Sequence, residues 1–389
     1  MRFTALLCAI LLVGSSAAPN RYLVVWAMEA NHFPANGDGR DVLAIFDVGT
    51  DFGKLVAVVA TPTHAMMAHH TNEEMPPNHL LFASDFMAGQ GEIFDVSDPR
   101  SPRLAGSFAG AGGYTHAHSF AALSNGHTLA TYQIKGWNGD AAGALVELDR
   151  HGQIVRAASA SAPSADPNVR PYGLLVLENL DRVVTTSAPM PPLDVKAPTH
   201  VIQIWRLSDL KLLETLDLPK PSAHDVSAQY ADDAALLADG KTVMVKTAHC
   251  GLFVLSDLTA QRAKIQYAYD FGGRGCSGVP VVSGHYWVQA LMSGHALVSL
   301  DVSDPFHPIE VSHLYLGPKA LPHWLSLDRE TGSIVITGYG SLINRISFAS
   351  IDVATGALTL DSRFIDLKDR TWADGWSGAV IPHGAVFYR

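Results

Sequence analysis

The sequence has few charged residues, no excess of basic ones and few cysteines. Only 16% of its 389 residues are charged, and 27 Lys and Arg face 37 Asp and Glu, a formal net charge of −10. A chain without a basic surface neutralises few phosphates, so we expect no nucleic-acid partner. Beyond the N-terminal region no apolar stretch approaches the roughly 18 residues of a membrane helix, so we expect no membrane anchor either.

The remaining composition favours a β-rich globular protein. Hydrophobic residues make up 48% of the chain, which excludes intrinsic disorder. The 33 glycines and 22 prolines are unsuited to a helical bundle and typical of many strands joined by tight turns.

The N-terminus has the organisation of a secretory signal peptide. Met1 and Arg2 provide a short positive region, residues 3–14 are apolar, and residues 15–18 are small enough for a signal peptidase. The alternative is a buried first strand or helix. We predict a signal peptide over residues 1–18 and an exported protein, periplasmic or extracellular, over residues 19–389.

A single pattern recurs seven times along the mature chain. An apolar strand ends near an Asp and is followed by a polar turn and a second apolar strand, as in LAIFDVGTDFGKLVAVVA and LVSLDVSDPFHPIEVSHLYL. Copies begin about 50 residues apart, and two further strand-like runs separate them, so that each unit has four strands. The aligned anchor residues are Asp47, Asp95, Asp149, Arg206, Val254, Asp301 and Asp352.

Four-stranded units at this period predict a β-propeller. One such sheet leaves both of its faces apolar, and only stacking on neighbouring sheets around a ring covers them. The predicted fold is therefore all-β: a single seven-bladed propeller with four-stranded antiparallel blades. The first strand (RYLVVWAM) and the C-terminal run (SGAVIPHGAVFYR) are expected to share one blade and close the ring.

Histidines concentrate where the innermost strand of each unit begins. These openings read THAMMAHHT, GYTHAHSF, RPYGLL, SAHDVS, GCSGVP, LPHWLS and WSGAVIPHG. Because inner strands surround the central channel, the side chains are expected to converge on its axis. Imidazoles with few carboxylates favour a transition metal over calcium or magnesium. The alternative is that each histidine caps a strand or bonds a loop carbonyl.

Other motifs are weaker. Cys250 and Cys276 form no metal-type spacing and are either a disulfide or free thiols, with copper ligation a third possibility. The sequence GRGCSG matches a dinucleotide fingerprint but precedes a strand rather than a helix. A calcium-dependent lactonase would need several carboxylates in the channel, and only Asp225 and Asp374 lie near inner-strand openings.

The order of these motifs resembles the selenium-binding protein and methanethiol oxidase family. The resemblance rests on His69-His70, THAHS, the GALVELD hairpin, THVIQIWRLSDLKLLETLDL and the SLD turn near residue 326, and it covers most of residues 60–389. It implies a seven-bladed propeller. It also implies a copper-dependent conversion of methanethiol, oxygen and water to formaldehyde, hydrogen sulfide and hydrogen peroxide.

Matched by motif, the resemblance implies His69, His70, His118 and His383 as metal ligands, and we add the neighbouring His116. His224 and His323 are the candidates for a proton shuttle or a further ligand. The sequence departs from the family after the His pair, where TNEEMPPN replaces a cysteine-containing segment, and Ser119 follows His118 where the family has Cys. These departures weaken any expectation of selenium binding.

Two functional hypotheses follow. The first is an exported, monomeric copper oxidoreductase that oxidises a small sulfur compound, with a thiol as substrate. The second is a non-catalytic propeller that presents one face to a protein or carbohydrate partner. The first requires the inner-strand histidines to lie within ligand distance of one metal, whereas the second predicts scattered histidines and an exposed apolar or aromatic patch.

Overall fold

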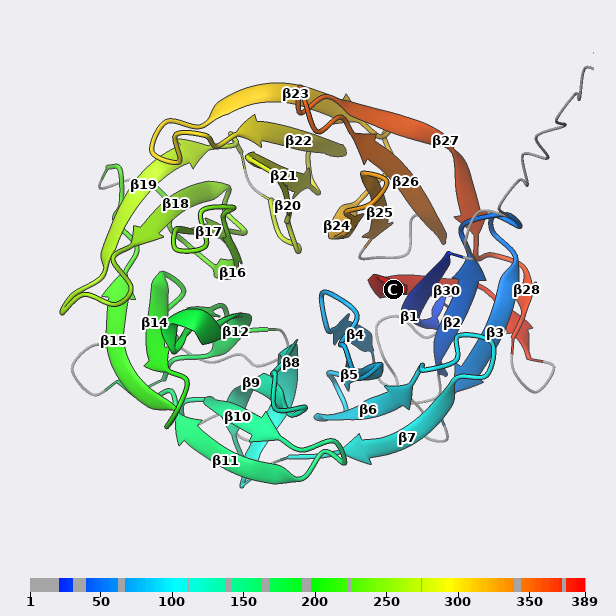
Figure 1. Cartoon of the computed structure of the whole chain (residues 1–389), viewed down its shortest axis with the longest axis horizontal. Helices are drawn as coiled ribbons and strands as arrows, with labels where there is room; N and C mark the ends of the chain where they lie inside the picture. The colour runs from blue at the N-terminus through cyan, green and yellow to red at the C-terminus, as the bar shows by residue number, and fades with distance from the viewer. Residues whose placement is uncertain are drawn as a thin grey trace, which may run out of the picture.

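The computed structural model describes residues 21–30, 40–61, 67–110, 112–136, 141–162, 168–190, 197–222, 225–273, 275–338, 344–372 and 376–388. They form seven four-stranded antiparallel blades arranged in a ring around a central channel (Figure 1). The predicted all-β seven-bladed fold is confirmed. The predicted signal peptide lies outside the described residues. Within them, no helix is long and apolar enough to cross a membrane.

In each blade one strand lines the channel and the fourth forms the outer rim. Blade 1 consists, from the channel outward, of β30 (Val380–Tyr388), β1 (Tyr22–Glu29), β2 (Asp41–Asp47) and β3 (Leu55–Ala60). Blade 2 consists of β4 (Ala68–Thr71), β5 (Leu80–Asp85), β6 (Gln90–Asp95) and β7 (Arg103–Phe108). Blade 3 consists of β8 (Tyr114–Ala122), β9 (Thr128–Lys135), β10 (Ala144–Leu148) and β11 (Ile154–Ser159). Blade 4 consists of β12 (Pro171–Leu177), β13 (Arg182–Ser187), β14 (Val201–Arg206) and β15 (Lys211–Asp217).

The remaining blades follow the same plan. Blade 5 consists of β16 (Ala231–Leu236), β17 (Val243–Thr247), β18 (Gly251–Ser256) and β19 (Lys264–Asp270). Blade 6 consists of β20 (Val281–Ser283), β21 (Tyr286–Leu291), β22 (Ala296–Asp301) and β23 (Ile309–Tyr315). Blade 7 consists of β24 (Pro322–Asp328), β25 (Ser333–Gly338), β26 (Arg345–Ile351) and β27 (Leu358–Asp366). A short ribbon, β28 (Arg370–Thr371) with β29 (Ser377–Gly378), and one 3-10 turn, η2 (Glu178–Leu180), complete the described elements.

The ring closes where the two ends of the chain meet. Strand β30 pairs antiparallel with β1, with Tyr388 opposite Tyr22 and Val380 opposite Glu29. The last strand is therefore the innermost strand of a blade whose other three strands come from the N-terminal region. The predicted sharing of one blade is confirmed.

The repeated Asp of the sequence pattern has a local structural role. The Asp47 carboxylate accepts a hydrogen bond of 2.7 Å from the backbone N–H two residues later, and the carboxylates of Asp95, Asp149, Asp301 and Asp352 make equivalent bonds. Each bond fixes the turn between the third and fourth strands.

The aligned residue of blade 5 does not occupy this position. Val254 lies inside β18, and the turn follows at Asp257, whose φ is +57°. Ser256, which pairs with Lys264 as Asp301 pairs with Ile309, occupies the anchor position, so the alignment of that copy starts two residues early.

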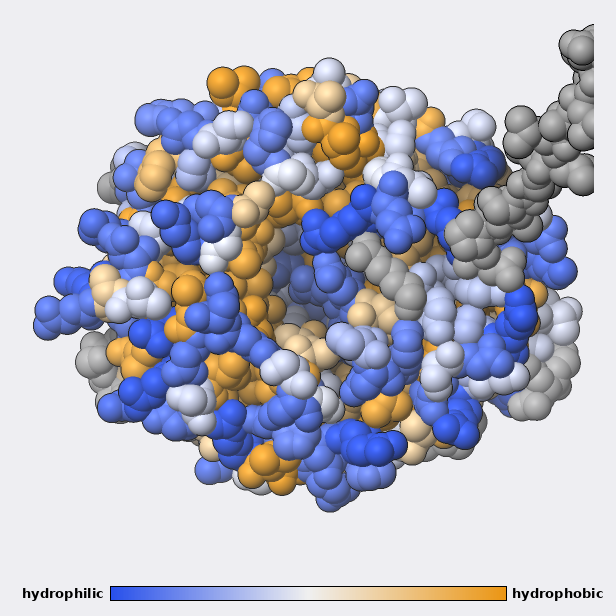
Figure 2. Space-filling model, in the orientation of Figure 1, coloured by the Kyte–Doolittle hydropathy of each residue, from blue (hydrophilic) through white to orange (hydrophobic). Residues whose placement is uncertain are grey.

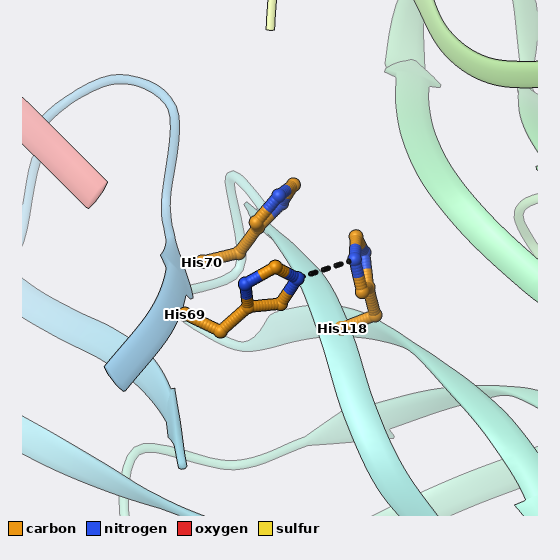
Figure 3. A group of neighbouring side chains, drawn as sticks. All are labelled: His69, His70 and His118. Atoms are coloured by element: carbon orange, nitrogen blue, oxygen red, sulfur yellow. Dashed lines mark hydrogen bonds between the residues drawn. The ribbon is translucent and has the colours of Figure 1, made fainter. Parts of the chain in front are cut away.

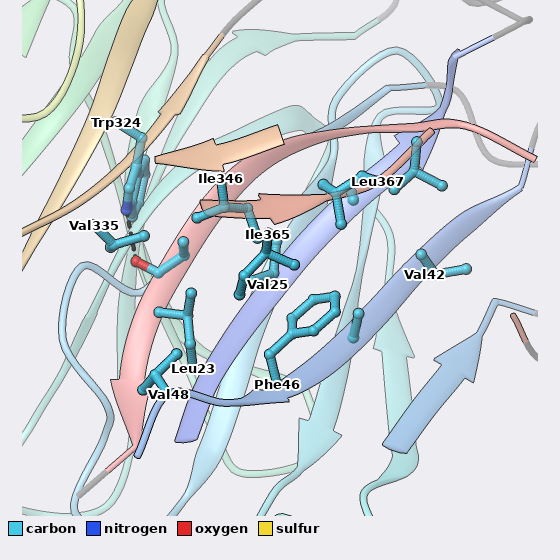
Figure 4. Close-up of a cluster of buried hydrophobic side chains, with 14 of the residues drawn as sticks. Leu23, Val25, Val42, Phe46, Val48, Trp324, Val335, Ile346, Ile365 and Leu367 are labelled. Carbon is cyan, nitrogen blue, oxygen red and sulfur yellow. Dashed lines mark hydrogen bonds between the residues drawn. The ribbon is translucent and has the colours of Figure 1, made fainter. Parts of the chain in front are cut away.

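Apolar contacts between neighbouring blades form the core. Each of the seven interfaces contains its own cluster of buried side chains. Strand β1 shows how one strand serves two of them: Leu23 and Val25 face blade 7, whereas Val24 and Trp26 face blade 2. Figure 4 shows the cluster between blades 7 and 1. Full burial of such an aliphatic side chain contributes about 1.5–3 kcal/mol.

Candidate metal centre

Five histidines from four blades meet at the axis of the ring. His69 and His70 come from β4, His118 from β8, His323 from β24 and His383 from β30, and none is more than 5% exposed. Their ring centroids are 4.1–6.3 Å apart in the pairs that touch. Figure 2 shows a hollow at the centre of the disc with hydrophilic residues on its floor.

A repeated backbone irregularity places these side chains. The register of the inner strand against the second strand shifts at the same place in four blades, and the shifts fall at His69–His70, His118–Ser119, His323 and His383–Gly384. A β-bulge of this kind inserts a residue into the inner strand and redirects its side chain. The bulges therefore turn the histidines toward the channel.

Hydroxyl groups on the second strands bind the backbone that the bulges disturb. Ser84 accepts a hydrogen bond from the His70 N–H at 3.2 Å, and Thr131 accepts one from the Ser119 N–H at 3.1 Å. Thr337 donates its hydroxyl to the His383 carbonyl of the next blade. These buried bonds hold the bulged segments in register with both neighbours.

The ring nitrogens form two overlapping groups. His69, His70 and His118 make one and His70, His323 and His383 make the other, and in each group the candidate ligand atoms lie within 4.8 Å of one another. The Nε2 atoms of His69 and His118 are 3.1 Å apart, and Figure 3 shows these two rings converging with His70 beside them. His70 belongs to both groups, so it is the candidate ligand that they share.

Hydrogen bonds fix the orientation of the outer rings. His383 Nδ1 lies 2.7 Å from the His69 carbonyl oxygen, which can only accept, so Nδ1 carries the proton and Nε2 keeps its lone pair. His118 Nδ1 lies 3.0 Å from Ser119 Oγ. His70 Nε2 is buried and has no hydrogen-bond partner among the described residues. A neutral imidazole with one nitrogen fixed in this way presents the other to a metal.

Burial keeps the five imidazoles uncharged. Loss of solvation lowers the pKa of each ring, and for His69, His70, His118 and His323 the neighbouring imidazoles lower it further. The pKa falls to about 3 for His118 and to about 4 for His383. Metal ligation needs the neutral form of histidine, which these side chains therefore keep at neutral pH.

Two predicted site residues are placed differently. His116 lies outside both groups: its φ is +62°, Nδ1 is 2.9 Å from Thr115 Oγ1, and the ring packs on Phe86. His224 lies outside the described residues. His323, expected as a shuttle or a further ligand, is a member of the second group.

Other histidines make the strand-end hydrogen bonds that the alternative hypothesis expected. His295 Nδ1 lies 2.6 Å from the Ala320 carbonyl, and His127 Nδ1 lies 2.6 Å from a carboxylate oxygen of Glu147. These side chains lie away from the channel, in turns between strands. The two kinds of histidine thus occupy different parts of the fold.

Sequence reasoning missed the groups that line the other half of the channel. Tyr172 of β12 stacks on His118 with ring centroids 3.7 Å apart. Asp232 of β16 forms a buried ion pair with Lys246 of β17, Nζ to Oδ2 2.7 Å. The register shifts at both Tyr172 and Asp232, as it does at the histidines. Aligning the openings RPYGLL and ADDAAL with the histidine-bearing ones would have found both residues.

Blade 6 completes the channel with an irregular segment. Cys276 is joined to Cys250 by a disulfide, which resolves the alternatives left open for the two cysteines. Two residues later, Gly278 has a φ of +123°, and a Cβ there would lie 1.7 Å from the His323 carbonyl oxygen. Only glycine fits this position, so the segment packs directly on the strand that carries His323.

Comparisons with known proteins place the fold. No family model matches the chain, and neither does any curated protein sequence. A hypothetical selenium-binding protein from Sulfolobus tokodaii superposes with a TM-score of 0.75 at 14% identity, covering 95% of this chain and 94% of that one. The periplasmic gluconolactonase of Pseudomonas aeruginosa gives 0.66 at 12% identity, covering 95% and 99%. At these identities the likeness establishes the propeller fold, and the chain's distant structural neighbours include both a selenium-binding protein and a gluconolactonase.

Proposed function

We propose that this propeller binds one transition-metal ion, copper, through its axial histidines and oxidises a small thiol with oxygen. The observation that carries the proposal is the meeting of five buried, neutral imidazoles from four blades, with His70 shared by two ligand groups. The choice of copper and of a thiol rests on the motif resemblance to methanethiol oxidases.

The donor set fits such an ion. The two groups consist of imidazoles alone, and imidazole nitrogens suit copper, zinc, nickel and iron rather than calcium or magnesium. His69 Nε2 and His118 Nε2 point at each other across 3.1 Å, so one of them must be protonated unless a cation lies between them. Bound copper would supply affinity for a thiolate sulfur and one-electron exchange with oxygen.

The protein's own residues orient and enclose the site. The bond from His383 Nδ1 to the His69 carbonyl joins ligands of two blades. Phe86 contacts the edges of His69 and His118, and Trp324 contacts that of His70. These rings cover the imidazoles with apolar surface, which excludes water from that side of the cluster.

A second candidate, a non-catalytic scaffold, is favoured by the rim of blades 6 and 7. Ile309 and Tyr315 on β23 and Phe364 on β27 are 65%, 57% and 49% exposed. An apolar rim of this kind suits contact with a protein partner. The scaffold hypothesis does not account for imidazoles gathered at the axis, because a contact surface on the rim gains nothing from them.

The test is metal analysis of the chain produced from residue 19 onward. We expect about one copper per chain after reconstitution and its loss in the His69→Ala/His70→Ala variant. The matched control, His307→Ala/His313→Ala, removes two exposed histidines with 81% and 52% exposed side chains and should keep the metal. Copper-loaded protein is then assayed for oxygen consumption with methanethiol. Failure to bind copper would contradict the proposal. Copper binding without oxygen consumption would contradict only the proposed oxidase activity.

A further inference from the structure

The channel is divided into two chemically different halves. The bulged positions of blades 7, 1, 2 and 3 carry the histidines, whereas those of blades 4 and 5 carry Tyr172 and Asp232. Asp232 thus occupies in blade 5 the position that His323 and His383 occupy in theirs. A register shift occurs at this position in six of the seven blades and turns the histidines of four of them toward the channel, so the Asp232 carboxylate is placed to face the channel as well.

Asp232 is a buried carboxylate with one oxygen engaged and one unengaged. Oδ2 accepts hydrogen bonds from Lys246 Nζ at 2.7 Å and from the Gly278 N–H at 3.4 Å. Oδ1 is buried and has no hydrogen-bond partner among the described residues, in a residue that is 2% exposed. An unengaged acceptor in such a place costs about 1–3 kcal/mol unless a ligand donates to it.

The segment that holds Asp232 also contacts the histidine centre. The Ser277 side chain hydrogen-bonds to the Asp232 carboxylate. The Ser277 backbone hydrogen-bonds to the His323 ring. Gly278 donates to Asp232 and packs against the His323 backbone. Lys246 Nζ donates to the Cys276 carbonyl at 2.9 Å, so the disulfide-bonded Cys276 fixes the same segment. The segment of residues 276–278 therefore contacts both the Asp232 carboxylate and the strand that carries His323.

The surroundings of Asp232 suit a proton acceptor. Burial raises the pKa of its carboxyl group, and the positive charge of Lys246 opposes that rise. The charged and titratable groups that act on this region are Lys246 of β17, Asp233 of β16, Glu73 after β4 and His323 of β24. Lys246 is the one cation among them, and its ion pair with Asp232 favours the ionised form of the carboxylate, which is the form that accepts a proton.

We propose that Asp232 accepts the proton of a small neutral thiol that binds in the channel beside His323. The S–H bond breaks, its electron pair stays on sulfur, and the proton forms an O–H bond at Oδ1, so the step needs no oxidant. This assignment rests on the function proposed above and names the group that converts the substrate to the thiolate that the metal prefers.

A route leads the proton away from Asp232. Lys246 acts electrostatically on Asp233 and Glu73, and burial raises the pKa of both carboxyl groups. Glu73 lines a pocket of about 240 Å³ together with Leu175 and Leu325, from the later halves of β12 and β24. The histidines lie near the starts of the inner strands, so this pocket opens at the opposite end of the channel. Glu73, on which both Lys246 and Asp233 act electrostatically, therefore connects this group of charges to the pocket.

The test uses protein loaded with Co²⁺, which does not oxidise thiols, and ethanethiol as the probe. Sulfur-to-cobalt absorption is followed as a function of pH in the wild type and in Asp232→Asn, whose amide oxygen can still accept the Lys246 hydrogen bond. We expect the pH midpoint of thiolate binding to rise by at least 1 unit in the variant, about a tenfold loss of binding at fixed pH. Co²⁺ affinity, measured by competition with a chelator, should stay within a few-fold of wild type.

Controls separate this inference from the proposed function. Glu92→Gln replaces another buried carboxylate, between blades 1 and 2, and should leave the midpoint unchanged. If Asp232→Asn does not fold, Asp232→Asn/Lys246→Gln replaces the ion pair by neutral amides and should give the same rise. An unchanged midpoint in a Co²⁺-loaded variant would overturn the role of Asp232 alone. Failure of the wild type to bind Co²⁺ would overturn the metal centre, and this inference with it.

Discussion

Replacing Glu92 by Gln should change how the stability of the metal-free protein depends on pH. Glu92 lies on β6 and is 2% exposed, and burial, together with the neighbouring Asp85 carboxylate, raises its pKa from 4.5 to about 8. The native state therefore holds a proton on Glu92 up to about pH 8, whereas the unfolded chain releases it near pH 4.5. Between these values the native state binds more protons, so the contribution of Glu92 to stability falls as pH rises.

The magnitude follows from the shift. One pKa unit corresponds to about 1.4 kcal/mol, so Glu92 removes about 3 kcal/mol from the free energy of unfolding between pH 5 and pH 7. Glutamine resembles the protonated acid and does not titrate. The free energy of unfolding of Glu92→Gln relative to wild type should therefore rise by about 3 kcal/mol over this interval. Any pH-independent effect of the amide on stability does not alter this difference.

Urea denaturation of metal-free protein at pH 5, 6 and 7 measures this difference. The control is Glu147→Gln: burial raises the pKa of Glu147, but hydrogen bonds from His127 and Arg156 lower it overall, so its titration lies below this interval. That variant should be less stable than wild type by a similar amount at all three pH values. Parallel stability curves for wild type and Glu92→Gln would refute the assignment of a raised pKa to Glu92.

Two further predictions concern how the ring is held. Trp324→Phe removes the 2.7 Å bond from the indole N–H to the β30 backbone, and should lower the free energy of unfolding by about 1–3 kcal/mol in urea denaturation, with Trp287→Phe as a buried comparison inside blade 6. Cys250→Ala/Cys276→Ala opens a loop with a sequence separation of 26 and should cost about 3 kcal/mol. Wild type measured in reductant should match that double variant, and a wild type insensitive to reductant would contradict the estimate.

The repeat in the sequence was enough to predict the architecture, because each blade carries the same strand–turn–strand signal. The turn Asp recurs in five copies, and alternation of apolar residues along strands such as β1 requires a neighbour on both faces. Ring closure followed from the unpaired strand at each end of the chain.

The candidate site was predicted only in part, because bulges leave no simple mark in a sequence. The position of four histidines at inner-strand openings was enough to predict that they converge at the axis: His69, His70, His118 and His383. The left-handed backbone of His116 could not be anticipated. Asp232 and Lys246 escaped notice because one belongs to a pair of acidic residues in an otherwise apolar strand and the other comes from the second strand of its blade. Their meeting depends on tertiary structure alone.

The pairing of β30 with β1 makes the histidine cluster depend on closure of the ring. His383 bonds to His69, which is 314 residues earlier in the chain. Before β30 pairs with β1, the ring is open and His383 is missing from the axis, so the five imidazoles come together only when the first and last described strands have joined. Under the proposed function, retention of the metal would then report a closed ring, and a chain that lacks β30 would be recognisable by its failure to retain the ion.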